Sequence, residues 1–196
     1  MPRLHALELL PDDAGAAAVR RDWQALRDAG LPSMLDHRGS TNTPHVTVVA
    51  SPEIAPEVEQ VAADTIGRLL PLAAPTSGLA LLGGERVSLV RLVAAPDDLV
   101  QAVLDLRGRL ADQPHPGWLP HATLARRLPR DRAPEALAVL GARTDDLVLT
   151  SLRRWDPDAD RVSTLAQGVA GRRNPSSTRS RSAAAWSARR SGRPSS

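Results

Sequence analysis

This chain of 196 residues contains two similar stretches, Pro44-His45-Val46-Thr47-Val48 and Pro120-His121-Ala122-Thr123-Leu124. Each begins with a proline, which a strand tolerates at its first position, and then alternates polar and apolar residues, as a half-buried strand does. Because side chains at i and i+2 share a face of a strand, histidine and threonine point one way and the apolar residues the other. The two stretches therefore predict two strands, each presenting an imidazole and a hydroxyl.

The sequence before each of these strands repeats one order of features. Pro11-Asp12-Asp13 in the first half and Pro96-Asp97-Asp98 in the second place acids at a helix start, where the helix dipole favours negative charge. Apolar residues then recur at helical spacing, and a loop leads to the P-H-x-T strand. A strand, P-D-D, a helix and a P-H-x-T strand, in that order twice, indicate an internal duplication.

Further strands and helices fit between these landmarks. We expect strands at Leu4–Leu10, Leu79–Leu82, Val87–Val93, Leu147–Leu152 and Arg161–Ala166, and helices at 56–70 and 132–140. This alternation predicts one α+β domain over residues 1–168. The duplication predicts two pseudo-symmetric lobes around a central cleft, roughly 1–75 and 76–168, with or without exchange of their terminal strands.

Charge and composition set the last segment apart. All 22 acidic residues lie at or before Asp160, and residues 1–168 carry 18 Arg against them, a net charge of about −4. Residues 169–196 hold the other seven Arg with much Ser, a composition that predicts a disordered tail. The tail's charge would suit a contact with RNA or a membrane surface, and an unselected basic extension is the alternative.

Composition also excludes several classes of protein and site. Cys is absent, which excludes disulfides, thiolate metal sites and cysteine nucleophiles. No apolar run approaches the roughly 20 residues of a membrane helix, and Pro2, Arg3 and His5 interrupt any signal-peptide core. We therefore expect a cytoplasmic, monomeric protein with no membrane partner.

Two histidine–threonine pairs around one cleft suit phosphodiester chemistry. Cleaving a P–O bond near neutral pH needs a base and an acid, and imidazoles with an ordinary pKa of about 6.5 can serve as both. Threonine hydroxyls can donate hydrogen bonds to the non-bridging phosphate oxygens. His45 and His121 are therefore candidate acid and base, and Thr47 and Thr123 candidate phosphate ligands, with no metal or cofactor required.

Other hydrolytic sites fit the sequence less well. A zinc site could be assembled from His37, His45, His115 and His121 with Asp36. It would leave the repeated threonines unexplained, and H-x-T lacks metal-ligand spacing. A serine hydrolase is disfavoured because the chain has no G-x-S-x-G motif.

The segments His45-Val46-Thr47-Val48 and His121-Ala122-Thr123-Leu124 resemble the paired H-x-[T/S]-Φ motifs of the 2H phosphoesterase superfamily, the 2′-5′ RNA ligase-like proteins and RNA 2′,3′-cyclic phosphodiesterases. The second motif continues to Arg126 and is close to the P-H-x-T-L-A-R of that group. The resemblance covers roughly residues 3–168. It implies a bilobed α+β fold and metal-independent hydrolysis, or ligation in reverse, of 2′,3′-cyclic phosphate or 2′-5′ bonds in RNA or nucleotides.

The resemblance also implies roles for individual residues. His45 would be the general acid and His121 the general base, while Thr47 and Thr123 would bind phosphate. Arg126 would also reach the phosphate, although its strand parity is opposite to that of His121, so the strand would have to end or twist first.

This chain departs from the family in two places. Val48-Val49-Ala50 follows the first motif, where many members have an Arg-rich or aromatic-rich strand. Tyr and Phe, on which members often stack a base, are absent, which leaves Trp118 as a stacking platform or, alternatively, a loop anchor. Two rivals to an RNA enzyme therefore stay open: a non-catalytic RNA- or nucleotide-binding module, and a cyclic phosphodiesterase of small metabolites.

Overall fold

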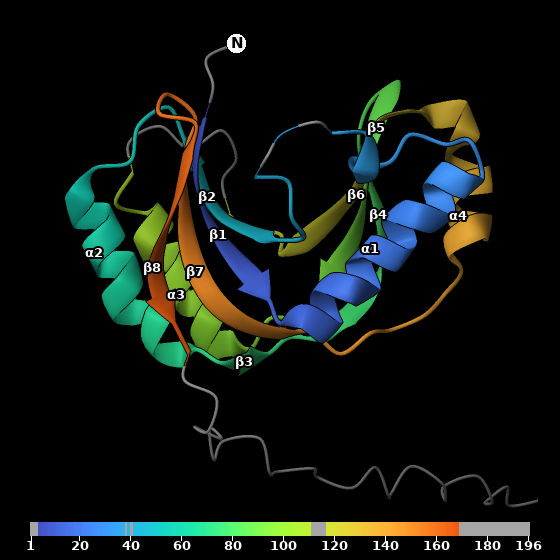
Figure 1. Cartoon of the computed structure of the whole chain (residues 1–196). Coiled ribbons are helices and arrows are strands. Elements are labelled where there is room, and N and C mark those ends of the chain that lie inside the picture. The colour runs from blue at the N-terminus through green and yellow to red at the C-terminus, as the bar shows by residue number, and fades with distance from the viewer. Residues whose placement is uncertain (1–3, 38, 40, 111–116, 169–196) are drawn as a thin grey trace, which may run out of the picture.

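The computed structural model describes residues 4–37, 39, 41–110 and 117–168, which form an eight-stranded sheet and four α-helices (Figure 1). The strands are β1 (His5–Pro11), β2 (Val46–Ser51), β3 (Leu72–Ala73), β4 (Thr76–Gly83), β5 (Arg86–Val93), β6 (His121–Pro129), β7 (Val148–Asp156) and β8 (Arg161–Gln167). The helices are α1 (Asp13–Asp28), α2 (Pro56–Thr65), α3 (Asp97–Arg107) and α4 (Ala133–Leu140). The predicted α+β class is confirmed, and the tail 169–196 lies outside the described residues.

The predicted helix 56–70 is shorter than expected. It ends at Thr65, and a 3-10 turn over Gly67–Leu69 follows it. Two features of the sequence account for this ending. Glycine is a poor helix former, and Leu70 precedes Pro71, a position from which the α conformation is sterically disfavoured.

The strands are all paired antiparallel, in the order β3-β7-β1-β2-β6-β5-β4, with β8 beside β7. β2 and β6 meet in the middle of this order, at the pair Val46 and Ala122. β4, which follows α2 in the chain, pairs with β5 of the second half. β7, which follows α4, pairs with β1 at the start of the chain. The half of the sheet that contains β1 and β2 therefore includes a strand, β7, from the far end of the described chain.

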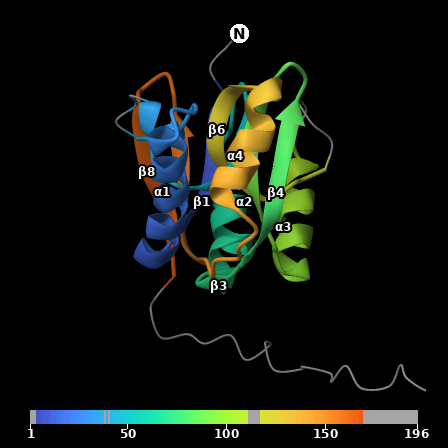
Figure 2. The ribbon, with the colours of Figure 1, turned by 90° about the vertical axis from the view of Figure 1, so that its right-hand side faces the viewer.

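The helices cover the sheet in two pairs, each over its own hydrophobic cluster. α2 and α3 lie against the half that contains β1, β2 and β7, where Leu7, Val48 and Val103 are fully buried (Figure 1). α1 and α4 lie against the half that contains β5 and β6, where Leu89 and Leu124 are buried, and Figure 2 shows this pair facing the viewer. Burying each such side chain contributes about 1.5–3 kcal/mol, so each helix pair fixes its half of the sheet.

The two P-D-D segments do begin helices, but they cap them differently. Asp12 is the N-cap of α1, and its carboxylate accepts a hydrogen bond of 2.8 Å from the Gly15 amide. In the second segment Pro96 takes the N-cap position, and the Asp98 carboxylate instead accepts from the Leu99 amide at 2.8 Å. In both cases acids occupy the first turn, where the exposed amides and the helix dipole favour them.

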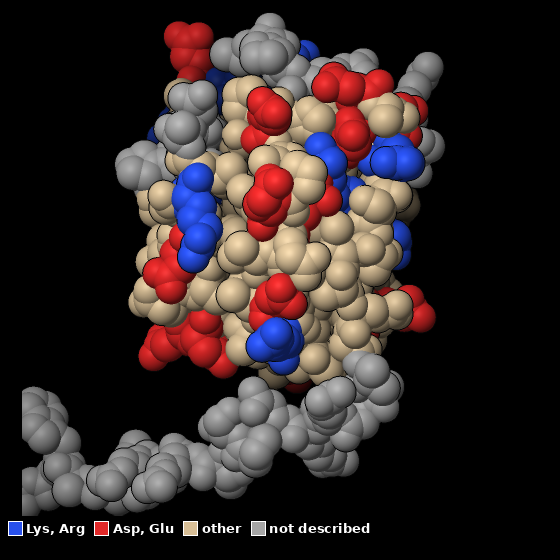
Figure 3. Space-filling view, turned by 90° about the vertical axis from the view of Figure 1, so that its left-hand side faces the viewer, with Lys and Arg blue, Asp and Glu red and all other residues tan. Residues whose placement is uncertain are grey.

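The surface over α2 mixes charges of both signs. Figure 3 shows acidic side chains scattered over this face, with separate basic groups among them and no broad basic area on its described part. Within the described residues, no helix has the length and apolar content needed to cross a membrane.

Candidate active site

The two H-x-T segments lie side by side at the centre of the sheet. One step to either side of the pair Val46 and Ala122, antiparallel pairing sets His45 across from Thr123 and Thr47 across from His121. Such neighbours are about 4.5–5.5 Å apart at Cβ. Val46 and Ala122 are buried beneath the sheet, while the histidines and threonines are partly exposed on the opposite face. The expected division of each strand into an apolar and a polar face is therefore observed.

Both imidazoles are held in the same way. Nδ1 of His45 lies 2.7 Å from the carbonyl oxygen of Thr43, and Nδ1 of His121 lies 2.6 Å from that of Leu119, in each case two residues earlier. Because a carbonyl can accept but not donate, Nδ1 carries the proton in both rings. Nε2 of each ring is therefore the nitrogen left for chemistry.

Two tryptophans hold the backbones of the two threonines. The indole of Trp118 donates a hydrogen bond of 2.8 Å to the Thr47 carbonyl, and that of Trp23 donates one of 2.9 Å to the Thr123 carbonyl. Trp118 also packs against the cluster under α2 and α3. The structure thus gives Trp118 the position of a loop anchor, the alternative to the stacking platform.

A cavity of about 570 Å³ opens beside these residues. Its walls include six side chains that the chemistry can use: Glu8, His45, Thr47, Arg126, Arg153 and Trp155. His121 and Thr123 are not among its lining residues and lie beside it on the neighbouring strand. The aromatic side chain in the cavity wall is therefore Trp155 of β7, which the sequence did not single out.

Arg126 reaches the cavity because β6 contains a bulge. The register with β5 shifts between the pairs Leu89–Ala125 and Val90–Thr123, so that Leu124 is an extra residue. Leu124 and Ala125 are consequently both buried, and Arg126 emerges on the face of the histidines. The alternation of faces along β6 argued against Arg126, but the extra residue reverses it, so that Arg126 lies on the same face as His121. Bulges commonly redirect side chains in this way next to functional sites.

Glu8 and Arg153 form a buried ion pair beside His45 that sequence reasoning missed. Both Nε and Nη2 of Arg153 lie on Oε2 of Glu8, at 2.8 and 2.7 Å, and Oε1 of Glu8 lies 3.4 Å from Nε2 of His45. The signal in the sequence was a lone acid between Leu7 and Leu9 in an otherwise apolar strand. Its partner lies 145 residues further along the chain, and no local pattern connects the two.

The surroundings of His121 favour its neutral form. Burial lowers the pKa of His121 below its ordinary 6.5, the bond to the Leu119 carbonyl opposes this, and the positive charges of His45 and Arg126 lower the pKa further. A neutral imidazole with Nε2 unprotonated is what a general base requires.

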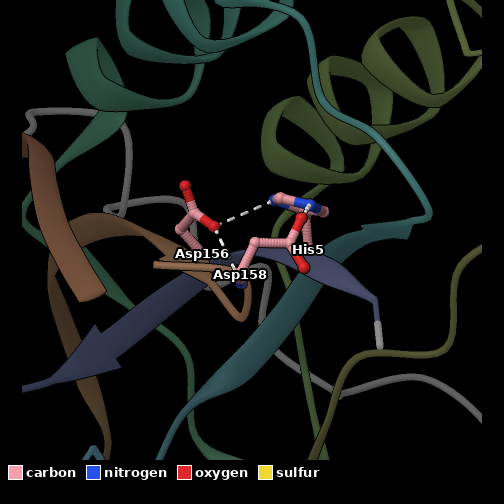
Figure 4. Close-up of side chains that lie close together, drawn as sticks. All are labelled: His5, Asp156 and Asp158. Carbon is pink, nitrogen blue, oxygen red and sulfur yellow. Dashed lines mark hydrogen bonds and ion pairs between the residues drawn. The ribbon is translucent and has the colours of Figure 1, made fainter. Parts of the chain in front are cut away.

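A different cluster has the composition of a metal site. His5, Asp156 and Asp158 bring three possible ligand atoms together (Figure 4). However, Nε2 of His5 already lies 3.2 Å from Asp158, and Arg154 donates to Nδ1 at 3.0 Å. Both ring nitrogens of His5 are engaged, and the guanidinium of Arg154 lies beside them. We therefore interpret the cluster as polar contacts that hold β1 to the turn after β7.

In the alternative zinc site, one of the expected ligands, Asp36, is engaged by other groups. Asp36 binds Arg27 at 2.9 Å and accepts from the Ser33 amide at 3.1 Å, which commits its carboxylate to the loop. His115 lies outside the described residues.

Comparison with solved structures gives matches at low sequence identity. A phosphoesterase shares 16% identity over 83% of this chain and 94% of its own, with a TM-score of 0.47. Escherichia coli LigT complexed with 3′-AMP shares 17% over 83% and 93%, with a TM-score of 0.44. Kluyveromyces marxianus Usb1 shares 14% over 84% and 98%, with a TM-score of 0.42.

Sequence comparison gives the family. No match to a curated protein was found. The profile described as the 2′-5′ RNA ligase superfamily matches residues 11–161, which include both H-x-T segments and most of the folded body. The chain therefore belongs to the 2′-5′ RNA ligase superfamily, a group of 2H phosphoesterases.

Proposed function

We propose that this protein is a metal-independent phosphoesterase that opens or forms 2′,3′-cyclic phosphate or 2′-5′ phosphodiester bonds in RNA or nucleotides. The observation that carries this proposal is the matched pair of imidazoles. Nδ1 of each is fixed by a backbone carbonyl, and each stands across from a threonine hydroxyl on one face of the sheet. A site built only for binding has no need for two such rings.

The proposed reaction uses one histidine at each end of the bond change. Nε2 of His121 takes a proton from water as the water oxygen forms a new bond to phosphorus. The bond from phosphorus to the 2′ or 3′ oxygen breaks, and Nε2 of His45 gives that oxygen its proton. With an alcohol in place of water, the same steps run as transfer or ligation.

The charge that develops on the phosphate has three candidate partners. The hydroxyls of Thr47 and Thr123 lie on the same face as the imidazoles and can donate to the non-bridging oxygens. The guanidinium of Arg126 lines the cavity and adds a charged donor.

The architecture behind this site is proposed to be two related lobes that exchange strands. The order strand, helix, H-x-T strand, helix, strand occurs twice as β1-α1-β2-α2-β4 and β5-α3-β6-α4-β7, with the two-residue β3 before β4. Pairing of β4 with β5 and of β7 with β1 places each final strand beside the first strand of the other copy. This arrangement supports exchange of terminal strands, with β2 and β6 meeting between the copies.

Trp155 supports a nucleotide substrate. Its side chain is in the cavity wall on the same strand as Arg153, and an indole offers a stacking surface for any base, worth about 1–3 kcal/mol. Trp155→Ala should therefore raise KM for cyclic nucleotides about 10-fold or more and leave the KM for a base-free ribose cyclic phosphate unchanged. A small-metabolite phosphodiesterase would instead prefer the base-free compound.

A turnover panel tests the function directly. The full chain is incubated in EDTA with 2′,3′-cyclic nucleotides, 2′-5′ dinucleotides and ADP-ribose cyclic phosphate, and products are followed by chromatography. We expect turnover of at least one nucleotide substrate that His45→Ala and His121→Ala abolish. Nucleotide binding without turnover would favour the binding module, and activity that depends on added zinc would favour a metal site.

A further inference from the structure

The contact between Glu8 and His45 has a defined polarity. Both nitrogens of Arg153 that hold the carboxylate lie on the same oxygen, Oε2, which leaves Oε1 to face Nε2 of His45 at 3.4 Å. Glu8 is 6% exposed and Arg153 is 9% exposed. Arg153 also donates to the Thr41 carbonyl at 3.2 Å. The position of Oε1 is therefore set by the fold.

The proton on Nδ1 of His45 cannot serve this contact, because that nitrogen donates to the Thr43 carbonyl. If Nε2 carried no proton, its lone pair would face the oxygen of a carboxylate, which repels it. If Nε2 carries a proton, the contact becomes a charge-assisted attraction. The separation of 3.4 Å is longer than the 2.7–2.9 Å of a tight bond of this kind, so such a proton stays available for transfer.

His121 lacks any comparable neighbour among the described residues. The groups whose charges act on it are His45 and Arg126, both positive when charged, and the bond at its Nδ1 is to a neutral carbonyl. Two imidazoles with the same backbone anchor thus meet opposite surroundings.

We propose that Glu8 is a positioning residue that keeps a proton on Nε2 of His45 and so fixes His45 as the acid and His121 as the base. This rests on the proposed function, because acid and base have meaning only for a reaction. Arg153 acts through Glu8 by holding Oε2, which fixes where Oε1 lies. The charged or titratable groups around His45 are Glu8 on β1, Arg153 on β7, His121 and Arg126 on β6, and His37 and Asp160 in the cavity wall.

Glu8→Gln is a sharp test because it keeps the shape of the side chain and reverses its preference. The amide oxygen can still accept from Arg153, and the amide NH₂ then faces Nε2 of His45, where it donates to the lone pair of a neutral ring. We expect kcat/KM on a cyclic nucleotide to fall about 10²-fold or more at neutral pH, the typical scale of lost acid catalysis, and the alkaline limb of the pH profile to move to lower pH. Glu8→Asp, which keeps the charge, should retain much of the activity, and the alkaline limb of its pH profile should stay near the wild-type position.

The leaving group separates acid catalysis from a structural role. A nucleoside p-nitrophenyl phosphodiester releases an anion that needs no proton, so Glu8→Gln and His45→Ala should both lose far less activity on it than on the cyclic nucleotide. Glu135→Gln is the matched control, because Glu135 is exposed on α4 and pairs with Arg132 at 2.6 Å. It should change neither activity nor the pH profile.

A titration of the histidine rings followed by NMR tests the contact without turnover. The His45 signal, assigned with His45→Ala, should titrate at lower pH in Glu8→Gln than in the wild type, and that of His121 should move less. An unchanged His45 midpoint, or equal losses on both leaving groups, overturns the role of Glu8. If the His45 midpoint shifts in Glu8→Gln but the wild-type protein turns over no phosphodiester, the contact between Glu8 and His45 stands and the proposed function is refuted instead.

Discussion

Each site imidazole is fixed at Nδ1 by its own backbone, which leaves Nε2 for chemistry. In the proposed reaction the acid and the base act on the same bond change, so removing either one should disable the whole unit. His45→Ala and His121→Ala should each lower kcat about 10²–10⁴-fold, and the double variant should be little worse than the weaker single one. Steady-state kinetics on a 2′,3′-cyclic nucleotide measures this, and multiplicative losses in the double variant would contradict the two-histidine mechanism.

The lowered pKa of His121 gives the site a pH dependence of known sign. Burial keeps the ring neutral to a pH below the ordinary 6.5, so the acidic limb of kcat/KM should lie below pH 6.5. The folded state also binds fewer protons at this ring than the unfolded state does. Its contribution to stability is therefore present above about pH 6.5 and is lost as the pH falls. An acidic limb above 6.5 that disappears in His121→Ala would show that the ring is not held neutral.

Among the helices and strands, local patterns were sufficient wherever a feature depends on residues close together in the sequence. The strands at Leu79–Leu82 and Val87–Val93, the starts of α1 and α3 and the polar face of each H-x-T strand were all predicted, because each depends on residues close together in sequence. The bulge at Leu124 was not predicted, because it arises from the register with β5, some 35 residues earlier. For the same reason the sequence could name Arg126 but could not show how it joins the histidines.

Other parts of the site could not be found from local sequence at all. Trp155 and Glu8 enter the cavity through the pairing of β1 with β7, between opposite ends of the described chain. Trp118 had two possible uses, and its bond to the Thr47 carbonyl is a long-range contact that no periodicity reveals.

The end of β8 makes a close contact that predicts the effect of a single methyl group. A Cβ on Gly168 would lie 2.5 Å from the Pro71 nitrogen and 2.8 Å from the Leu70 carbonyl carbon, both of them backbone atoms. Gly168→Ala should therefore lower the free energy of unfolding by about 1–3 kcal/mol, the usual scale of overpacking. Gly84→Ala is the control, since its Cβ would meet open space. Denaturant unfolding compares the two variants. Equal free energies of unfolding would mean that the backbone at the end of β8 shifts at little cost to make room for the methyl group.

At the scale of the whole molecule, a buried ion pair joins α1 to the sheet. Asp22, fully buried, accepts from Nε of Arg91 on β5 at 2.7 Å and also binds Arg143. Asp22→Asn would leave the buried guanidinium of Arg91 without its counter-charge, which typically costs about 3–5 kcal/mol. Asp64→Asn, which breaks an exposed pair with Arg68, should cost less than about 1 kcal/mol. Thermal unfolding of both variants measures the difference. Similar melting temperatures would mean that the ion pair between Asp22 and Arg91 does not stabilise the fold.

The folded body and the tail should be separable in function. Deleting 169–196 removes seven Arg but none of the residues proposed for the site. Turnover of a cyclic mononucleotide should therefore be unchanged, while any affinity for longer RNA should fall and depend less on salt, because fewer phosphate contacts release fewer counterions. Filter binding at several salt concentrations measures this. Loss of mononucleotide turnover would place the tail within the catalytic fold.

The pairing of β1 with β7 also sets the order in which the molecule can be completed. Ala6 leaves the ribosome before its partner Trp155, which follows roughly 150 residues later, or about 7 to 30 s at typical rates of synthesis. Until then β1 has no neighbour on that side, and the carboxylate of Glu8 has no Arg153 to neutralise it. The cavity wall is therefore among the last described features to form, and a nascent or truncated chain that lacks β7 carries both H-x-T segments without Arg153 and Trp155 beside them.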